Sequence, residues 1–131
     1  MINLFRGKRV LFVFSDPAGA KSLLAFSDSH KKIFEASLLI SNRDHPFYGE
    51  FDSQVKTILN DLDKLIRLIN EFNPDIIFTT TSFPAGIELN CIKIALKLRN
   101  VTTISFVDHW INFKARFIDN DVLYLPEKIL V

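Results

Sequence analysis

Four short segments of this chain are almost purely apolar, and each is followed at once by polar residues. They span residues 10–14, 36–40, 76–78 and 104–107. Segments of this length that are rich in Val, Ile, Leu and Phe fit strands buried on both faces of a parallel sheet, because half-exposed strands alternate apolar and polar residues instead. Helices must then cover both faces of the sheet.

The segments between these strands carry helical patterns. Pro17 suits the first turn of a helix that ends near residues 28–32, and Asn60 or Asp61 suits the N-cap of an amphipathic helix that ends at Phe72. A third helix is expected from about 85 to 99, and a last short strand at about 128–131. Residues 54–58 fit either a short strand or an early helical turn. This order predicts an α/β fold, a Rossmann-like three-layer α/β/α sandwich with a mostly parallel sheet of five or six strands.

Length and composition limit the chain to one domain of a restricted class. The 131 residues are 48% hydrophobic, which suffices for one core. The 16 basic residues against 15 acidic ones leave a net charge of +1, which argues against nucleic acid as a partner. No apolar run reaches the roughly 20 residues of a membrane span, although peripheral association with a membrane stays open.

The cysteine and histidine content points away from disulfide and metal chemistry. Cys91 is the only cysteine, and it lies on the apolar stripe of the third predicted helix, so we expect it in the core. A chain without a disulfide or signal peptide is expected to be cytoplasmic. The histidines at 30, 45 and 109 are too scattered for a zinc site.

The loop after the first strand is the first candidate binding segment. It reads Ser15-Asp16-Pro17-Ala18-Gly19-Ala20-Lys21 and brings small residues to a helix N-terminus, where free amides favour a phosphate, a carboxylate or a sugar hydroxyl. We take Ser15, Gly19 and Lys21 as ligand-binding candidates and Asp16 as a candidate base. The loop matches neither the dinucleotide fingerprint nor a P-loop, because Gly19 is its only glycine. Asp16 alternatively serves only as a helix cap.

Hydroxyl side chains follow the third apolar segment. Thr80, Thr81 and Ser82 are ligand-binding candidates at the end of that strand. In the alternative reading the threonines are ordinary strand residues and Ser82 is the N-cap of the third helix.

An acid, an imidazole and an indole follow the fourth segment, at Asp108, His109 and Trp110. His109 or Asp108 suits a general base, and Trp110 suits stacking on a sugar or a base. Alternatively, Trp110 packs against the sheet end and His109 binds backbone. Because the carboxyl ends of parallel strands meet at one edge of a sheet, we expect these residues and the two preceding loops to share one site.

The residues that carry a family resemblance are the Ser15–Ala20 loop, the hydroxyl cluster at 79–82, the segment from Ile104 to Phe117 and the closing Pro-Glu-Lys-Ile-Leu-Val at 126–131. Together they resemble the N-terminal, acceptor-side domain of a GT-B-type bacterial glycosyltransferase of surface polysaccharide biosynthesis. The resemblance covers nearly the whole chain. Its most distinctive part is the Asp-His-Trp segment.

This resemblance implies a function and partners. The chain would be the N-terminal half of a two-domain enzyme, inactive alone, that binds a sugar or lipid-linked sugar acceptor. The donor, a nucleotide sugar, would be held by a donor-binding domain or subunit, so this half would bind no cofactor and no metal. His109, Asp108 or Asp16 would deprotonate the acceptor hydroxyl. Self-association of the isolated chain is also expected, since a face built for contact would leave apolar surface in water.

A second hypothesis needs only the loop at 15–21. In it the chain is a non-catalytic Rossmann-like module that binds a nucleotide or an anion, or a partner subunit, and Asp108 and His109 are structural. A second βαβ pattern with a nucleotide-binding glycine loop in a continuing or neighbouring reading frame would favour the glycosyltransferase hypothesis.

Overall fold

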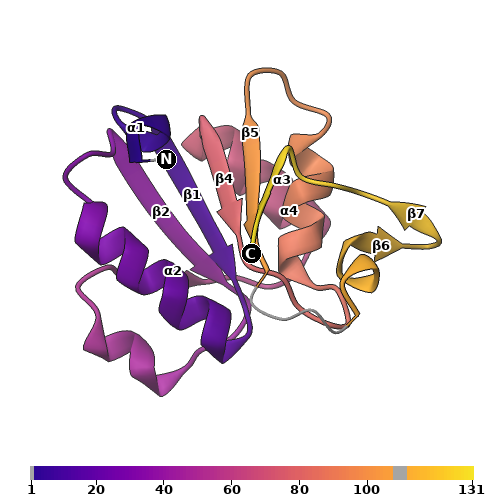
Figure 1. Ribbon diagram of the computed structural model, residues 1–131, viewed down its shortest axis with the longest axis horizontal. Coiled ribbons are helices and arrows are strands. Elements are labelled where there is room, and N and C mark those ends of the chain that lie inside the picture. Colours follow the sequence, from indigo (N-terminus) through magenta and orange to yellow (C-terminus); the bar gives the residue numbers. More distant parts are fainter. Residues whose placement is uncertain (1, 108–111) are drawn as a thin grey trace.

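The computed structural model describes residues 2–107 and 112–131. Helices and strands alternate along the chain, with short 3₁₀ turns (η) and one small hairpin between them (Figure 1). Their bounds are α1 Ile2–Phe5, β1 Arg9–Phe14, α2 Pro17–His30, β2 Ala36–Ser41, η1 Pro46–Glu50, β3 Val55–Thr57, α3 Leu62–Phe72, β4 Ile76–Thr79, α4 Ile87–Ala95, β5 Thr102–Phe106, η2 Lys114–Phe117, β6 Ile118–Asp119, β7 Val122–Leu123 and β8 Lys128–Leu130.

The central sheet has six strands, all parallel, in the order β3-β2-β1-β4-β5-β8. The predicted fold class, a Rossmann-like α/β sandwich with five or six strands, is confirmed. Each of the four apolar segments forms a strand, and the residues at 128–130 add the edge strand beside β5. The continuous apolar character of these segments follows from burial on both sides, since every residue of β4 is buried.

Each face of the sheet has its own core. On one face, Leu23 and Leu24 of α2 pack with an aromatic cluster in which the ring of Phe12 lies 5.7 Å from Phe34 and 5.9 Å from Phe78. On the other face, α3 and α4 pack over β1 and β4. Cys91 of α4 is fully buried there, as expected for a small core residue. The molecule is thus layered helix, sheet, helix.

The helix starts agree with the sequence signals. Pro17 is the first residue of α2. Asp61 is the N-cap of α3, and its carboxylate accepts a hydrogen bond of 3.0 Å from the Lys64 amide. The helix ends where Asn73 adopts a left-handed conformation, with φ of 54°, directly before Pro74.

The third helix is shorter than predicted. We expected it over about 85–99, whereas α4 covers Ile87–Ala95. Gly86 holds the N-cap position, so the alternative reading of Ser82 as the N-cap is wrong. At the other end the chain tightens into turns of the i→i−3 type, with the Lys97 amide bonded to the Ile94 carbonyl and the Leu98 amide to the Ala95 carbonyl.

Short elements complete the fold. Residues 55–57 form strand β3 beside β2, so the strand alternative for 54–58 is confirmed. Strands β6 and β7 form a small antiparallel hairpin outside the main sheet. Neither this hairpin nor α1 was predicted. The two strands of the hairpin have 2 residues each and α1 has 4, which is too few to show a repeating apolar pattern.

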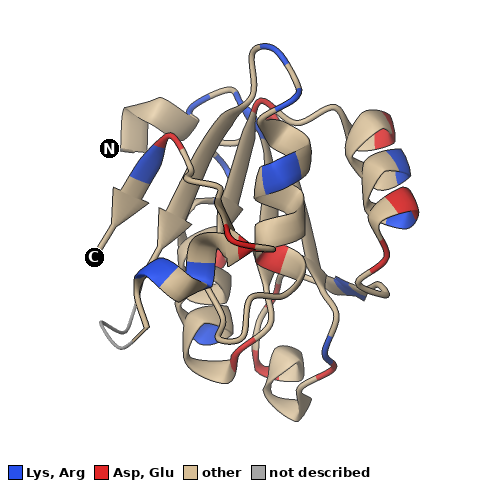
Figure 2. Cartoon of the chain, turned by 90° about the vertical axis from the view of Figure 1, so that its right-hand side faces the viewer, with Lys and Arg blue, Asp and Glu red and all other residues tan. Residues whose placement is uncertain are grey.

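Basic and acidic residues are interspersed over the elements that face the viewer in Figure 2. The outer side of α3, for example, carries Asp63, Lys64, Arg67 and Glu71.

Candidate functional site

The candidate site is defined by a reversal in the strand order. From β1 the sheet extends through β2 to β3, and from β4 it extends the other way through β5 to β8. The chain leaves β1 toward α2 on one face and leaves β4 toward α4 on the other (Figure 1). In open α/β sheets, ligands usually bind beyond the carboxyl ends of strands whose following loops diverge in this way. We call this edge of the sheet, which carries Ser15, Asp16 and residues 80–82, the crevice.

Two of the predicted polar groups lie at this crevice. Ser15 and Asp16 follow β1, and the hydroxyl residues follow β4, its neighbour in the sheet. The Thr80 amide donates a 3.0 Å hydrogen bond to the Val13 carbonyl, which ties the second loop to the end of β1. Ser15, Thr80, Thr81 and Ser82 are buried, while the Asp16 side chain is 36% exposed. Among these five side chains, that of Asp16 is therefore the one accessible to a ligand.

A buried carboxylate joins the two loops. Glu88, in the first turn of α4, is only 2% exposed. Its Oε2 accepts hydrogen bonds from Ser15 Oγ at 2.8 Å and from Thr80 Oγ1 at 3.1 Å. Its Oε1 lies 3.2 Å from Ser82 Oγ. Three predicted ligand-binding hydroxyls thus contact a core glutamate.

Sequence reasoning did not single out Glu88. A signal was present, because Glu88 stands four residues before Ile92 and seven before Ala95, and all three are buried. A charged residue that shares the i, i+4, i+7 positions of an apolar stripe indicates a core carboxyl that needs hydrogen-bond donors.

The environment of Glu88 favours its protonated form. Burial raises the pKa of this carboxyl, and the negative charge of Asp16 adds to the increase, while the hydrogen bonds from the Glu88 backbone, Ser15 and Thr80 oppose it. The net effect is a pKa above the ordinary value of 4.5.

Gly19 brings α2 against the loop after β4. A Cβ atom added at Gly19 would lie 2.7 Å from Thr80 Cγ2 and 2.8 Å from Thr80 Cβ, which is closer than real Cβ contacts come. The contact that the structure gives Gly19 is therefore helix packing at the crevice wall. Lys21, two residues further along, is exposed, and its ammonium lies 5.0 Å from the centre of the Phe47 ring.

Residues after β2 lie against the loop after β1. Arg43 Nη1 lies 3.7 Å from Asp16 Oδ1. His45 Nε2 is 2.8 Å from the Ser15 carbonyl, and since a carbonyl only accepts, this nitrogen carries the proton. The His45 ring stacks on Phe47 with 5.1 Å between ring centres. The segment after β2 thus brings a cation and aromatic rings to the loop that carries Asp16.

The segment that follows residues 108–111 returns to the same edge. Arg116 of η2 donates a hydrogen bond of 3.2 Å from Nη1 to Thr81 Oγ1. Directly before residues 108–111, the Val107 amide donates a hydrogen bond of 2.8 Å to the Leu130 carbonyl, which holds the end of β5 beside β8. The candidates Asp108, His109 and Trp110 lie outside the described residues, and their roles stay predictions.

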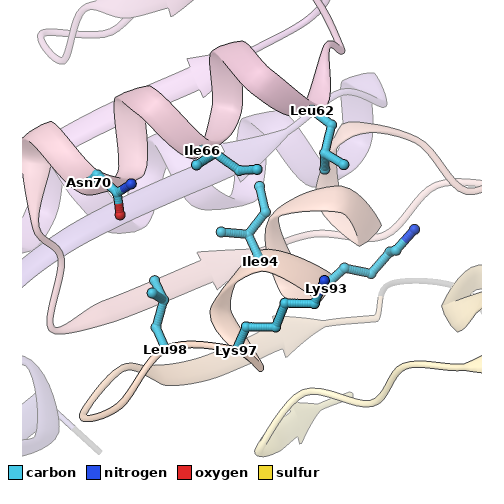
Figure 3. A pocket seen from close by; sticks show the side chains of 7 residues that line it. All are labelled: Leu62, Ile66, Asn70, Lys93, Ile94, Lys97 and Leu98. Carbon is cyan, nitrogen blue, oxygen red and sulfur yellow. The ribbon is translucent and has the colours of Figure 1, made fainter.

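Two apolar hollows lie away from the crevice. One runs between α3 and α4, where Figure 3 shows Leu62 and Ile66 facing Ile94, with the lysines of α4 and its following turn at the rim. The other lies beside α2, over β4, β5 and β8. Neither contains a predicted site residue, and their apolar lining does not suit a polar ligand.

No group of three His, Cys, Asp or Glu side chains is arranged to hold a metal ion among residues 2–107 and 112–131. None of the helices described here has both the length and the apolar character needed to cross a membrane.

Comparison of the chain with protein-family models, with curated proteins and with solved structures found no match. The candidate function therefore rests on the fold, the crevice and its chemistry.

Proposed function

We propose that the crevice between the loops after β1 and β4 binds a sugar acceptor, and that the chain is the acceptor-side half of a nucleotide-sugar-dependent glycosyltransferase of polysaccharide or glycoconjugate biosynthesis. The observation that carries this proposal is the partly exposed Asp16–Arg43 pair at the point where the strand order reverses. A carboxylate and a guanidinium side by side offer acceptors and donors to neighbouring hydroxyl groups, which is the chemistry that sugars require.

The proposed reaction divides between two parts. A base on this half removes the proton of an acceptor hydroxyl, whose oxygen attacks the anomeric carbon of the donor, and the nucleoside diphosphate leaves with its bonding electrons. Asp16 is the candidate base within the described residues, and His109 and Asp108 are the candidates outside them. The donor nucleotide sugar is held by a second domain or subunit.

A titration of the isolated chain followed by amide NMR tests this proposal. We expect methyl glycosides of glucose, galactose or N-acetylglucosamine to shift the amide signals of Ser15, Asp16 and Thr81. Asp16→Asn should weaken that binding by about tenfold, because the amide loses a charge-assisted hydrogen bond. Glu71→Gln, a matched neutralisation on the exposed side of α3, should leave the affinity unchanged.

The alternative function is a nucleotide- or anion-binding module without catalysis. The cations Arg43 and Lys21 beside the first turn of α2 favour it. Under this alternative, UDP, GDP or CDP shifts the Ser15 and Asp16 signals and the methyl glycosides do not. That result would contradict the acceptor-side proposal.

The partner in this proposal is a donor-side domain or a second copy of the chain. On the face that α2 covers, the hollow beside α2 exposes apolar side chains that include Phe106, Leu130 and Val131. Strand β8 is also an edge of the sheet. Both features are apolar or unpaired surface that a partner would remove from water.

Self-association of the isolated chain is expected at high concentration for this reason. Light scattering should show the apparent mass increasing with protein concentration. Leu130→Arg should reduce the increase, whereas Arg67→Glu on the exposed side of α3 should not. A constant monomer mass over the whole range would contradict this part of the proposal.

A further inference from the structure

The hydroxyl of Ser82 has more acceptors than it has protons. Ser82 Oγ lies 3.2 Å from Glu88 Oε1 and 3.3 Å from the Pro84 carbonyl oxygen. A serine hydroxyl donates one hydrogen bond and a carbonyl only accepts. If Glu88 were a carboxylate, Ser82 would have to divide one proton between two acceptors in a buried site.

A neutral Glu88 resolves this hydrogen-bond pattern. With a proton on Oε1, Glu88 donates to Ser82 Oγ, and Ser82 donates to the Pro84 carbonyl. On the other oxygen, Oε2 accepts from Ser15 Oγ and Thr80 Oγ1, as a carbonyl oxygen with two lone pairs can. Each of these buried polar atoms then has a partner, which is the normal condition of a protein interior.

Within the part of the chain that the structure describes, none of the ion pairs includes Glu88. The described ionisable groups that interact with it include Asp16 after β1, Cys91 on α4 and Tyr48 on η1. Asp16 disfavours a second negative charge, and the other two are neutral at physiological pH because burial raises the pKa of both. Arg116 bonds to the neighbouring Thr81.

From this geometry we infer that Glu88 is a positioning residue of the crevice and acts as a neutral carboxylic acid that ties the loop after β1 to the loop after β4. It does not touch the ligand. It fixes Ser15, next to Asp16, against Thr80 and Ser82, next to Thr81, and so sets the separation of the two crevice walls. The positioning role rests on the proposed binding site, whereas the protonation state and the loop contacts do not.

The first test is spectroscopic and needs no ligand. In protein labelled with ¹³C at the glutamate side-chain carboxyl, the Glu88 signal is assigned by its loss in Glu88→Gln. We expect it to keep the shift of a protonated acid while the pH is raised through 4.5, where an unperturbed glutamate titrates. The Ser15 and Thr81 amide signals should move when Glu88 finally ionises in the wild type and not move in Glu88→Gln. A Glu88 signal that titrates at the ordinary glutamate value of 4.5 would overturn the inference.

The second test compares two substitutions of Glu88. Glutamine reproduces the neutral pattern, since its amide group donates to Ser82 and its carbonyl accepts from Ser15 and Thr80. Hydrogen exchange at the Thr80 amide, which is bonded to Val13, should therefore stay within about twofold of the wild type in Glu88→Gln. In Glu88→Ala it should increase by roughly tenfold or more, because the hydroxyls lose their common partner. Equal damage in both variants would show that the charge is required and would overturn the neutral-acid assignment.

The pH dependence of stability has a definite sign. Because the pKa of Glu88 is higher in the folded chain than in the unfolded one, this residue contributes stability below pH 4.5 and the contribution is lost as the pH rises through the folded-state pKa. Urea titrations should show the wild type losing stability relative to Glu88→Gln over that interval. These readouts involve no sugar or nucleotide, so they separate failure of this inference from failure of the proposed function.

Discussion

Gly19→Ala is expected to destabilise the protein by about 1–3 kcal/mol, although alanine is the better helix former. The added Cβ would lie 2.7 Å from Thr80 Cγ2, so α2 must move away from the end of β4. Thermal unfolding should show a midpoint about 5–15 °C lower than that of the wild type.

A second glycine provides the matched control. At Gly49 an added Cβ meets no atom within 4 Å, and Gly49→Ala should change stability by less than about 0.5 kcal/mol. The clash itself is tested by combining Gly19→Ala with Thr80→Gly, which removes the three side-chain atoms nearest to the new Cβ. The double variant should be more stable than the sum of the single effects predicts. Strict additivity would show that Gly19 is needed for another reason.

The same substitution also bears on binding. Because Gly19 contacts Thr80 and Thr80 contacts Glu88, a displaced α2 would separate Asp16 from the loop after β4. We therefore expect the Ser15 and Asp16 amide signals to move in Gly19→Ala and to return toward their wild-type positions with Thr80→Gly.

The elements that the sequence predicted are those whose residues repeat a burial pattern. Strands buried on both faces are nearly continuous apolar runs, so β1, β4 and the apolar end of β5 could be predicted from the sequence pattern. The amphipathic helix α3 was also predicted, with Asn60 or Asp61 as its cap. Leu65 and Ile69 of its predicted apolar stripe are buried, whereas Leu62 and Ile66 are exposed. Parallel strands put their carboxyl ends at one edge, and the two described loops of the candidate site lie there as expected.

The parts that were missed depend on contacts between distant segments. The contact of Gly19 with Thr80, for example, cannot be seen in the sequence. Glu88 was not singled out from the sequence, because charged residues are rarely buried without partners. Its partners come from the loops after β1 and β4, and only the folded chain brings them together. The ends of α4 were misjudged for a local reason, since the tightened turn after Ala95 follows the same apolar pattern as a helix.

Loss of His109 is expected to have the largest effect on the proposed reaction. If His109 is the general base, His109→Ala should lower turnover by roughly 100-fold to 10,000-fold, because positioned proton transfer is lost, while acceptor affinity stays nearly unchanged. Asp16→Asn should have the opposite pattern, because the Asp16 carboxylate faces Arg43 and offers a hydrogen-bond acceptor to the sugar. Loss of this carboxylate should raise KM by about tenfold with a small change in kcat.

Steady-state rates of the two variants, measured with a donor-binding partner present and with acceptor concentration varied, separate these roles. Asp108→Asn serves as the comparison, because Asp108 is adjacent to His109 in the sequence. If Asp108 only orients the imidazole, this substitution should lower turnover less than removal of the base itself. Unchanged turnover in His109→Ala together with a large loss of kcat in Asp16→Asn would move the base to Asp16. The base would then stand next to Ser15, one of the hydroxyls bonded to Glu88, so that Glu88→Ala should lower kcat and Glu88→Gln should preserve it. Unchanged kcat and KM in both His109→Ala and Asp16→Asn would contradict catalysis from this edge of the sheet and favour the non-catalytic binding module.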